Sequence, residues 1–342
     1  MALGLGELGH ELRLFGKNDS SGSWDGHDLT GAKPLIGAIR TAGFAVATLG
    51  AVLRSRPQHV ISTHLNFGPV ALLAKRLFGT RYTLVAHGID VHPDLPARTL
   101  DAMRNADRII AVSAWTRGRV TALGGIDPAK VTIVPNAFDE TRFTAGPKPE
   151  RLRKAYGILP GEKVLLTVGR LDQRERYKGC DRLINALGDI QQRCGPVRFI
   201  VVGTGDDRDR VIALARDKGQ EKSVVFTGFV APEDLADHYR LADAFAMPST
   251  GEGFGIVFAE ALACGTPVVA GNRDGSVDAL DGGRLGKLVD PLSGPAIVEG
   301  VCDVLCGRGP ALWYDRQELH NAVRMKFGRD AFSKRLGEAL LI

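Results

Sequence analysis

Two glutamates lie eight positions apart in an otherwise apolar segment. Glu252 and Glu260 belong to "STGEGFGIVFAEALACG" at residues 249–265. This pattern predicts a short, buried helix that begins near Gly253 and is stopped by Gly265. A buried carboxylate is costly unless it is hydrogen-bonded or neutralised, so both side chains need partners.

The spacing of the two glutamates suits a long polar ligand. At 1.5 Å per helical residue, Glu260 lies about 12 Å beyond Glu252, and the helix N-terminus offers backbone N–H groups to an anion. One carboxylate could accept from sugar hydroxyls and the other from ribose hydroxyls, with a diphosphate between them. The alternative is that both are structural glutamates paired with arginines or backbone groups.

A second group of candidate residues carries positive charge. In "VGRLDQRERYKGCDRL" (168–183), Arg170 closes a predicted strand and Lys178 stands at the start of a predicted helix. Two cations at the carboxyl edge of a parallel sheet predict a clamp for a diphosphate. Arg174 and Arg176, in the same loop, are interpreted as solvated charges.

Two further motifs end predicted strands. "LVAHGIDVHP" (84–93) places His87 at a strand end, where it would face a cleft, although a lone histidine is more often a polar core or surface residue. "VVGTGDD" (201–207) has only two glycines of a dinucleotide-binding fingerprint and is a weak signal.

These motifs are embedded in alternating strand-like and helix-like segments. Strands are predicted at 59–65, 81–88, 106–113, 130–136, 164–170, 198–205, 223–230, 244–249 and 267–272, and helices at 68–79, 114–125, 180–192, 207–218 and 232–242. The alternation predicts an α/β protein with two Rossmann-like parallel-sheet domains facing a cleft. A polar segment with three prolines at 137–160 is predicted to be a linker. We expect an N-terminal domain at 1–145, joined by a C-terminal helix at 328–342, and a second domain at 146–327.

Composition narrows the functional classes. The 342 residues are 44% hydrophobic and 24% charged, with a formal net charge of +5, as in ordinary globular proteins. The basic residues are scattered, which disfavours nucleic acid but leaves anionic substrates or a membrane surface open. No apolar segment reaches the about 20 residues that span a bilayer, and no signal peptide is visible. The five cysteines form no CxxC pair and no cluster with histidine, so we expect free thiols, no metal site and a cytoplasmic protein.

Several motifs in order give the chain a family resemblance from about residue 57 to residue 292. They are "HGID", "VSAWTRGRV", "IVPNAFDETRF", "VGRLD…YKGCDRLINAL", "VVGTGDD", "FTGFV", "LADAFAMPS", "EGFGIVFAEALACGTPVVAG" and "GSVDAL". The chain resembles the large family of retaining glycosyltransferases with the two-domain GT-B fold, which includes many bacterial mannosyl- and glucosyltransferases. "GNRDGSVDAL" departs from the commoner form of the family, which has a glycine in place of Asp274.

The resemblance implies a role for each candidate residue. Arg170 and Lys178 would bind the donor diphosphate, Glu252 would contact the donor sugar, Glu260 the ribose, and His87 would lie beside the reacting sugar. The other implied contacts are the backbone N–H groups of Phe254, Gly255 and Ile256 near sugar and phosphate, and Phe229 and Val230 along the base pocket. Similar proteins need no metal ion, and we expect no cofactor.

We therefore expect a retaining glycosyltransferase that moves a hexose from UDP-hexose or GDP-mannose to a glycan or lipid-linked glycan. The resemblance implies attack by the acceptor from the leaving-group side, in cell-surface polysaccharide synthesis, with the protein in the cytoplasm and possible peripheral contact with the inner membrane face. Two alternatives stay open: a sugar-nucleotide epimerase of the same fold, which would convert donor without acceptor, and a non-catalytic nucleotide-binding protein.

The beginning of the sequence differs from that of similar proteins, whose first domain opens with a strand, a glycine-rich loop and a long helix. Here "GHELRLFG" (9–16) looks like the family's second strand. We expect the first strand, which is central in a doubly wound sheet, and the glycine-rich loop to be missing. The natural protein would then begin about 25–40 residues earlier; the alternative is a shortened but complete domain.

Overall fold

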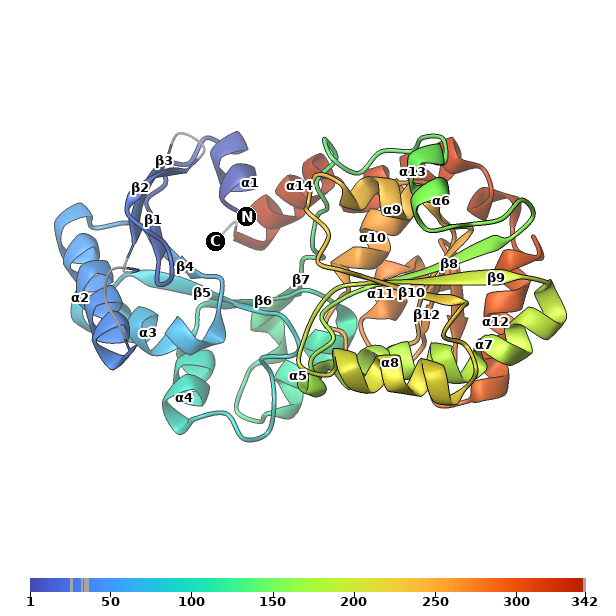
Figure 1. The fold of residues 1–342 in the computed structure, drawn as a ribbon. Helices are drawn as coiled ribbons and strands as arrows, with labels where there is room; N and C mark the ends of the chain where they lie inside the picture. Colours follow the sequence, from blue (N-terminus) through green and yellow to red (C-terminus); the bar gives the residue numbers. More distant parts are fainter. Residues whose placement is uncertain (25–26, 32, 34–36, 341–342) are drawn as a thin grey trace. The chain divides into compact units, whose positions relative to one another are not determined.

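The computed structural model describes residues 1–24, 27–31, 33 and 37–340. The chain divides into two compact units, Met1–Val134 with Asp330–Ile342 and Pro135–Arg329, which we call unit 1 and unit 2. The boundary predicted from the sequence fell after residue 145. Each unit is described by itself below (Figure 1).

Unit 1 is built on a four-stranded parallel sheet in the order β4-β5-β6-β7. Its strands are β4 (His59–Ser62), β5 (Arg81–Ala86), β6 (Arg108–Ala111) and β7 (Val131–Ile133). The connecting helices are α3 (Gly68–Phe78), α4 (Ala97–Asn105) and α5 (Ala114–Ala122). Five of the six residues of β5 are buried, as expected for a parallel strand covered on both faces. Gly79, with φ of 72°, ends α3 in the left-handed conformation that favours glycine.

A smaller three-stranded sheet precedes these elements in unit 1. It consists of β1 (Leu14–Gly16), β2 (Gly22–Trp24) and β3 (His27–Gly31) in the order β1-β3-β2. The strand expected at 9–16 is therefore limited to its last three residues. The long helix α2 (Gly37–Ser55) follows, and its Phe44 ring packs 4.6 Å from the Phe67 ring, centroid to centroid.

The last helix of the described chain returns to unit 1. The α14 helix (Arg329–Leu340) packs against α1 (Ala2–Glu7), where the Ser333 hydroxyl donates a 2.8 Å hydrogen bond to Glu7 Oε2. A Cβ at Gly4 would lie 2.9 Å from Ser333 Oγ, so the two helices approach closely. Leu336 of α14 is fully buried. The fold of unit 1 therefore includes a segment that follows all of unit 2 in the chain.

Unit 2 contains a six-stranded, wholly parallel sheet in the order β10-β9-β8-β11-β12-β13. The strands are β8 (Lys163–Val168), β9 (Val197–Val202), β10 (Val224–Gly228), β11 (Ala244–Met247), β12 (Val268–Gly271) and β13 (Lys287–Val289). The helices are α7 (Cys180–Cys194), α8 (Arg208–Asp217), α9 (Leu235–Leu241), α10 (Ile256–Ala263), α11 (Ser276–Ala279), α12 (Gly294–Leu305) and α13 (Arg316–Phe327). Two parallel α/β sheets confirm the predicted fold class, and the structure has an element at each predicted strand and helix of 59–272, with ends that differ by a few residues.

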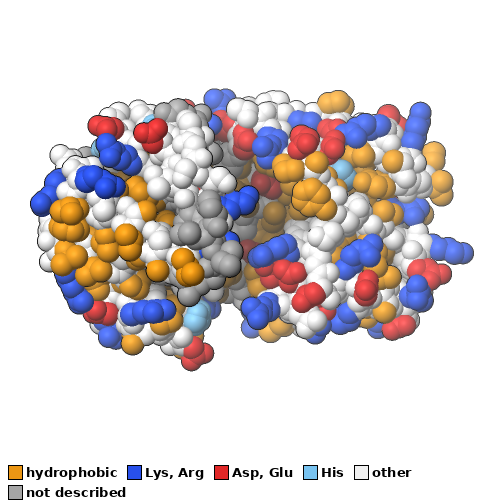
Figure 2. All heavy atoms as spheres, turned by 60° about the vertical axis from the view of Figure 1, so that its left-hand side comes forward, with side chains coloured by type: hydrophobic (Ala, Val, Ile, Leu, Met, Phe, Trp, Pro, Cys, Tyr) orange, Lys and Arg blue, Asp and Glu red, His pale blue; other side chains and the backbone are white. Residues whose placement is uncertain are grey.

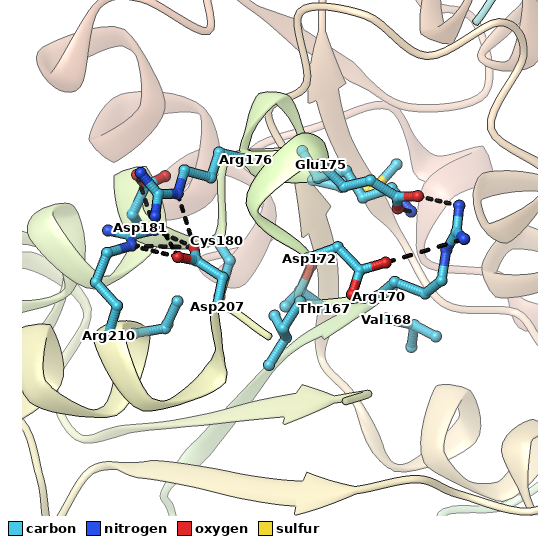
Figure 3. Close-up of a pocket in the computed structure, with 15 residues that line it drawn as sticks. Thr167, Val168, Arg170, Asp172, Glu175, Arg176, Cys180, Asp181, Asp207 and Arg210 are labelled. Carbon is cyan, nitrogen blue, oxygen red and sulfur yellow. Dashed lines mark hydrogen bonds and ion pairs between the residues drawn. The ribbon is translucent and has the colours of Figure 1, made fainter. Parts of the chain in front are cut away.

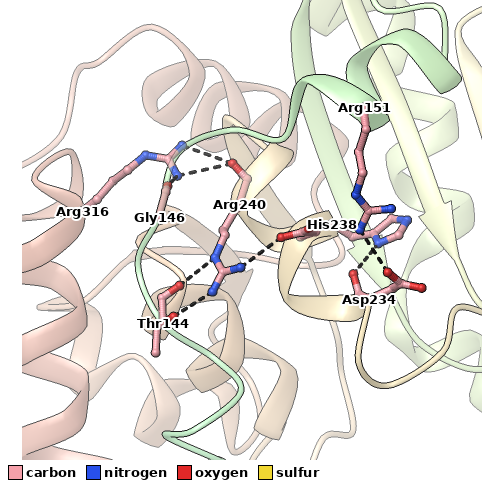
Figure 4. Close-up of polar contacts among 8 residues, drawn as sticks. Thr144, Gly146, Arg151, Asp234, His238, Arg240 and Arg316 are labelled. Atoms are coloured by element: carbon pink, nitrogen blue, oxygen red, sulfur yellow. Dashed lines mark hydrogen bonds and ion pairs between the residues drawn. The ribbon is translucent and has the colours of Figure 1, made fainter.

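The interpretation of residues 137–160 as a linker is wrong. This segment contains α6 (Glu150–Ala155) and packs within unit 2. Arg240 donates to the carbonyl of Thr144 at 2.9 Å and to its hydroxyl at 2.7 Å, and Arg316 donates to the Gly146 carbonyl at 3.0 Å (Figure 4). Side chains from distant helices thus hold a polar, proline-containing segment.

The cysteines and the hydropathy of the helices concern the whole described chain. All five cysteines carry free thiols, and Cys306 Sγ lies 3.5 Å from Cys194 Sγ. Within the described residues, no helix combines the length and the apolar character needed to cross a membrane.

Candidate active site

The loop after β8 carries both predicted phosphate-binding cations. Arg170 follows the strand by two residues, and a 3-10 turn at Gln173–Lys178 leads to Lys178. Gly179 then adopts φ of 81°, and a Cβ there would lie 2.6 Å from the Pro248 carbonyl oxygen. Only glycine fits this approach without a shift of the backbone, so α7 begins at the residue after it.

A second loop, between β9 and α8, supports the first. The Leu171 N–H donates to the Thr204 carbonyl at 2.9 Å, and the Asp207 N–H donates to the Leu171 carbonyl at 2.8 Å. A Cβ at Gly203 would lie 1.9 Å from the Gly169 carbonyl oxygen, and one at Gly205 would lie 2.3 Å from the Leu171 carbonyl. The two glycines of "VVGTGDD" therefore let two loops touch, which accounts for a motif that only partly matched a nucleotide-binding fingerprint.

Arg176, interpreted as a solvated charge, is 46% exposed but also pairs with a buried carboxylate. Asp207 is 4% exposed and accepts hydrogen bonds from Arg176 at 2.5 and 3.0 Å and from Arg210 at 2.6 to 3.0 Å. The two guanidinium groups hold the pKa of the Asp207 carboxyl far below its usual range, against the opposing effect of burial. Figure 3 shows this ion cluster in the pocket that Arg170 also lines.

Glu252 is positioned by a buried carboxylate that the sequence analysis did not interpret. Asp274 is 2% exposed and accepts from the Ser249 hydroxyl at 2.7 Å, the Glu252 N–H at 2.8 Å and the Ser276 N–H at 3.0 Å. The Gly275 N–H donates to the Glu252 carbonyl at 2.8 Å. Asp274, which replaces a glycine of the commoner family form, thus fixes the backbone of Glu252; its departure from that form was the only signal in the sequence.

The structure brings Lys178 and Glu252 together, although 74 positions separate them in the chain. Lys178 Nζ lies 3.8 Å from Glu252 Oε1, and the two side chains are 20% and 14% exposed. Their loops are joined by the Thr250 N–H, which donates to the Tyr177 carbonyl at 3.0 Å, and by Arg182, which donates to the Pro248 carbonyl at 2.8 Å. Burial raises the pKa of Glu252, the neighbouring carboxylates Asp274 and Glu175 raise it further, and Lys178 opposes them.

The α10 helix begins at Ile256, three residues later than predicted. Gly255 caps it with φ of 77°, a left-handed conformation that cannot continue a helix. The Phe254 side chain is buried against Phe327, with ring centroids 5.2 Å apart, so its backbone is the part available to a ligand. Within the described residues, the N–H groups of Phe254 and Gly255 have no hydrogen-bond partner. These donors, with the first N–H groups of α10, can receive an anion.

Glu260, one turn into the same helix, has a partner from α9. The Tyr239 hydroxyl donates to Glu260 Oε2 at 2.8 Å. Burial raises the pKa of Glu260, and the bond from Tyr239 opposes this. Within the described part of the chain, Oε1 accepts no hydrogen bond, so it can accept from a ligand hydroxyl.

Phe229 and Val230 directly follow β10, the edge strand of the unit 2 sheet. The Phe229 side chain is 76% exposed. An exposed ring at the carboxyl edge of a parallel sheet offers a surface on which a nucleotide base can stack.

His87 belongs to unit 1 and follows β5 directly. Its N–H donates to Asp90 Oδ1 at 2.8 Å, and its Nε2 lies 2.9 Å from the Thr63 carbonyl oxygen. Because a carbonyl oxygen only accepts, Nε2 carries the proton and Nδ1 is the acceptor in the neutral ring. The backbone and the ring are thus both fixed at the carboxyl end of the strand.

The two parallel α/β units and a cation-rich, carboxylate-containing loop cluster define a glycosyltransferase of the GT-B fold that uses a nucleotide sugar. The family described as "Glycosyl transferases group 1" matches residues 162–306, and "Glycosyltransferase Family 4" matches residues 1–142. The chain belongs to the group 1 glycosyltransferases.

Relatives with assigned activities support this membership. A GDP-mannose-dependent alpha-(1-6)-phosphatidylinositol monomannoside mannosyltransferase of Mycobacterium tuberculosis is 33% identical over 312 residues, which cover 82% of this chain and 80% of the relative. A D-inositol 3-phosphate glycosyltransferase of Actinosynnema mirum is 33% identical over 298 residues, which cover 77% and 70%.

Solved structures share the fold. The crystal structure of Anabaena HepE in complex with UDP and glucose has a TM-score of 0.74 at 21% identity and covers 92% of this chain and 85% of that one. A glycosyltransferase from Rickettsia africae has a TM-score of 0.80 at 18% identity and covers 98% and 92%.

Proposed function

We propose that the protein is a retaining hexosyltransferase that uses GDP-mannose or a UDP-hexose and glycosylates a glycan or lipid-linked glycan for the cell surface. The observation that carries the proposal is that Lys178 lies 3.8 Å from Glu252 and shares the partner Glu175 with Arg170. The names of the two relatives make GDP-mannose the first donor to test and inositol-containing lipids or phosphates the first acceptors.

In the proposed reaction, Arg170, Lys178 and the N–H groups at the start of α10 stabilise the negative charge that grows on the leaving diphosphate. Glu252 accepts hydrogen bonds from hydroxyls of the transferred sugar, and His87 contacts the same sugar. The acceptor oxygen bonds to C1 on the face from which the diphosphate leaves, the bond between C1 and the diphosphate oxygen breaks, and the hydroxyl proton passes to the departing diphosphate, so the anomeric configuration is kept. Because these groups supply the positive charge, we propose that transfer needs neither a metal ion nor a cofactor.

The test is an assay of the purified protein with each nucleotide sugar, with and without acceptor, in the presence and absence of EDTA. Transfer that depends on acceptor, resists EDTA and keeps the donor's anomeric configuration, read from the C1–H1 coupling, supports the proposal. Conversion of the donor without acceptor would instead identify an epimerase, and binding without turnover a non-catalytic nucleotide-binding protein. A requirement for a divalent metal ion would contradict the proposed charge stabilisation.

Lys178→Ala tests the role of the cation directly. We expect kcat/KM to fall at least about 100-fold, the scale for losing one donor to a developing oxyanion. Lys218→Ala, which removes the same charge from an exposed position on unit 2, is the matched control and should leave kcat/KM unchanged. Equal activity of both variants would contradict the assignment of Lys178.

One surface of unit 1 supports a membrane-bound acceptor. Ile39, Val46 and Leu53 of α2 are 66%, 71% and 50% exposed, and their spacing of seven residues puts them on one side of the helix. Val46 and Leu53 lie between Arg40 and Arg54, with no charged residue in between, and Ile39 directly precedes Arg40. Figure 2 shows hydrophobic side chains gathered on this face of unit 1 with Lys and Arg side chains around them. We propose that this face of α2 contacts an anionic membrane surface, which is suited to apolar residues framed by arginines.

Vesicle sedimentation tests the membrane contact. Val46→Asp should abolish binding to vesicles of phosphatidylglycerol and phosphatidylcholine, and pure phosphatidylcholine should bind the unaltered protein weakly. Met325→Asp is the matched control, because Met325 is 82% exposed on unit 2. Unchanged vesicle binding of Val46→Asp would contradict the proposal, as would a concentration-dependent dimer that this substitution abolishes.

A further inference from the structure

One carboxylate occupies the place between the two proposed phosphate-binding cations. Glu175 Oε1 forms an ion pair with Arg170, and Glu175 Oε2 lies 2.8 Å from Lys178 Nζ. The Glu175 side chain is only 10% exposed. Figure 3 shows the contacts of the Arg170 guanidinium with both Glu175 and Asp172.

The Glu175 carboxylate lies near two cations but, within the described structure, is not fully hydrogen-bonded. Its Oε2 is buried and makes no well-directed hydrogen bond among the described residues, even though the Lys178 ammonium group is near. Its backbone (φ −113°, ψ 17°) leaves the helical region inside the turn that carries it. The Glu175 carboxylate therefore occupies the position in which the same two cations would bind phosphate oxygens, and its Oε2 lacks a well-directed hydrogen bond from the described chain there.

The carboxylates near Arg170 and Lys178 outnumber these two cations. In the described part of the chain, Arg170 and Lys178 together contact three carboxylates: Glu175 lies near both, Asp172 lies 3.9 Å from Arg170, and Glu252 lies 3.8 Å from Lys178. A nucleoside diphosphate brings further negative charge to cations that are already neutralised. Glu175, the most buried of these carboxylates, therefore opposes the diphosphate while it orients its binding partners.

We propose that Glu175 is an internal counter-ion: it holds Arg170 and Lys178 ready for the donor diphosphate and weakens their hold on the nucleoside diphosphate product. The inference rests on the proposed function, because it requires these cations to bind the diphosphate. Glu175 is thus a positioning residue that makes product release faster.

Glu175→Gln separates this role from a structural one, because the amide keeps an acceptor of the same size but removes the charge. We expect the variant to bind GDP and UDP about tenfold more tightly in isothermal titration calorimetry, with a steeper weakening by salt. The donor KM and kcat should both fall, since the product leaves more slowly. Glu175→Asp, which keeps the charge, should restore affinity close to that of the unaltered protein.

Asp209→Asn is the matched control, since it removes the same charge from a 99% exposed position in α8, away from Arg170 and Lys178. Its affinity should change less than twofold. Weaker or unchanged binding by Glu175→Gln would overturn the inference, and Glu175→Ala applies the same test if the glutamine variant does not fold. If the unaltered protein binds neither GDP nor UDP, the proposed function itself fails, and the inference fails with it.

Discussion

Two carboxylates of the candidate site, Glu252 and Glu260, are largely withdrawn from solvent, and only Glu252 has a cation, Lys178 at 3.8 Å, within ion-pair distance among the described residues. Burial raises the pKa of both. Between the ordinary value of 4.5 and the raised value, the folded state binds more protons than the unfolded state. The free energy of unfolding therefore falls as the pH rises through this interval and is then constant. The ligand-binding role proposed for these groups thus carries a stability cost at neutral pH.

Glu260→Gln should reveal this cost. The amide oxygen can still accept from Tyr239, while the buried charge is lost. We expect the melting temperature at pH 8 to rise by a few degrees, on the order of 1 kcal/mol, and the difference to vanish as the pH falls toward 4.5. Nucleotide affinity should fall about tenfold through the lost charge-assisted bond to ribose.

Thermal unfolding across this pH range, with calorimetric titration of GDP and UDP, measures both effects. Glu233→Gln, at an exposed position just before α9, is the control and should change neither quantity. A lower melting temperature for Glu260→Gln at pH 8 would mean that its carboxylate is stabilising.

Sequence reasoning predicted some of these residues and missed others for a physical reason. Glu252 and Lys178 were found because charged residues interrupt apolar or glycine-rich segments at the ends of predicted strands. Glu175, Asp274 and Tyr239 were missed because their roles depend on contacts between segments that only the fold brings together.

At the scale of elements, the candidate site depends on loops that touch through their backbones. The β9–α8 loop supports the loop of Arg170, and the contact requires the absence of side chains at Gly203 and Gly205. The two glycines thus help to position the loop that carries Arg170.

Gly205→Ala tests this support. The added Cβ would lie 2.3 Å from the Leu171 carbonyl, so the loop must shift, which we expect to cost about 1–3 kcal/mol of stability. Nucleotide affinity should also fall, because a shift of Leu171 displaces its neighbour Arg170, which we propose binds the diphosphate. Gly118→Ala in α5, where a Cβ meets nothing within 4 Å, is the control and should be neutral or slightly stabilising. Denaturant unfolding and calorimetry measure the two quantities, and equal behaviour of both variants would contradict the proposed support.

Alternation of apolar segments predicted the strands and helices well, because both faces of the parallel sheets are covered. The start of α10 and the packing of 137–160 were mispredicted. The first depends on the left-handed conformation of Gly255, and the second on Arg240 and Arg316, which lie far along the chain from the segment that they hold.

At the scale of the molecule, nearly all of the candidate donor site belongs to one unit. The proposed contacts to diphosphate, ribose and base all lie within Pro135–Arg329, whereas His87 lies in unit 1. The α14 helix belongs to unit 1 although it follows unit 2 in the chain.

Removal of residues 330–342 should therefore destabilise unit 1 and leave nucleotide binding by unit 2 nearly unchanged. We expect faster hydrogen exchange in α1, which loses Ser333 as partner of Glu7, and lower transferase activity. Binding of GDP or UDP should stay within about twofold, because unit 2 keeps its core and its loops. Loss of nucleotide binding on this truncation would show that the donor site depends on unit 1.

The return of α14 also has a consequence for synthesis on the ribosome. Every residue of unit 2 has been made before α14, so unit 2 can fold while unit 1, begun first, still lacks a helix. Until α14 arrives, the surface that will cover Leu336 stays open to solvent and to other chains. Unit 1 thus begins synthesis first but can complete its fold only after unit 2 has been made. We expect unit 1 to need a chaperone for the longer time.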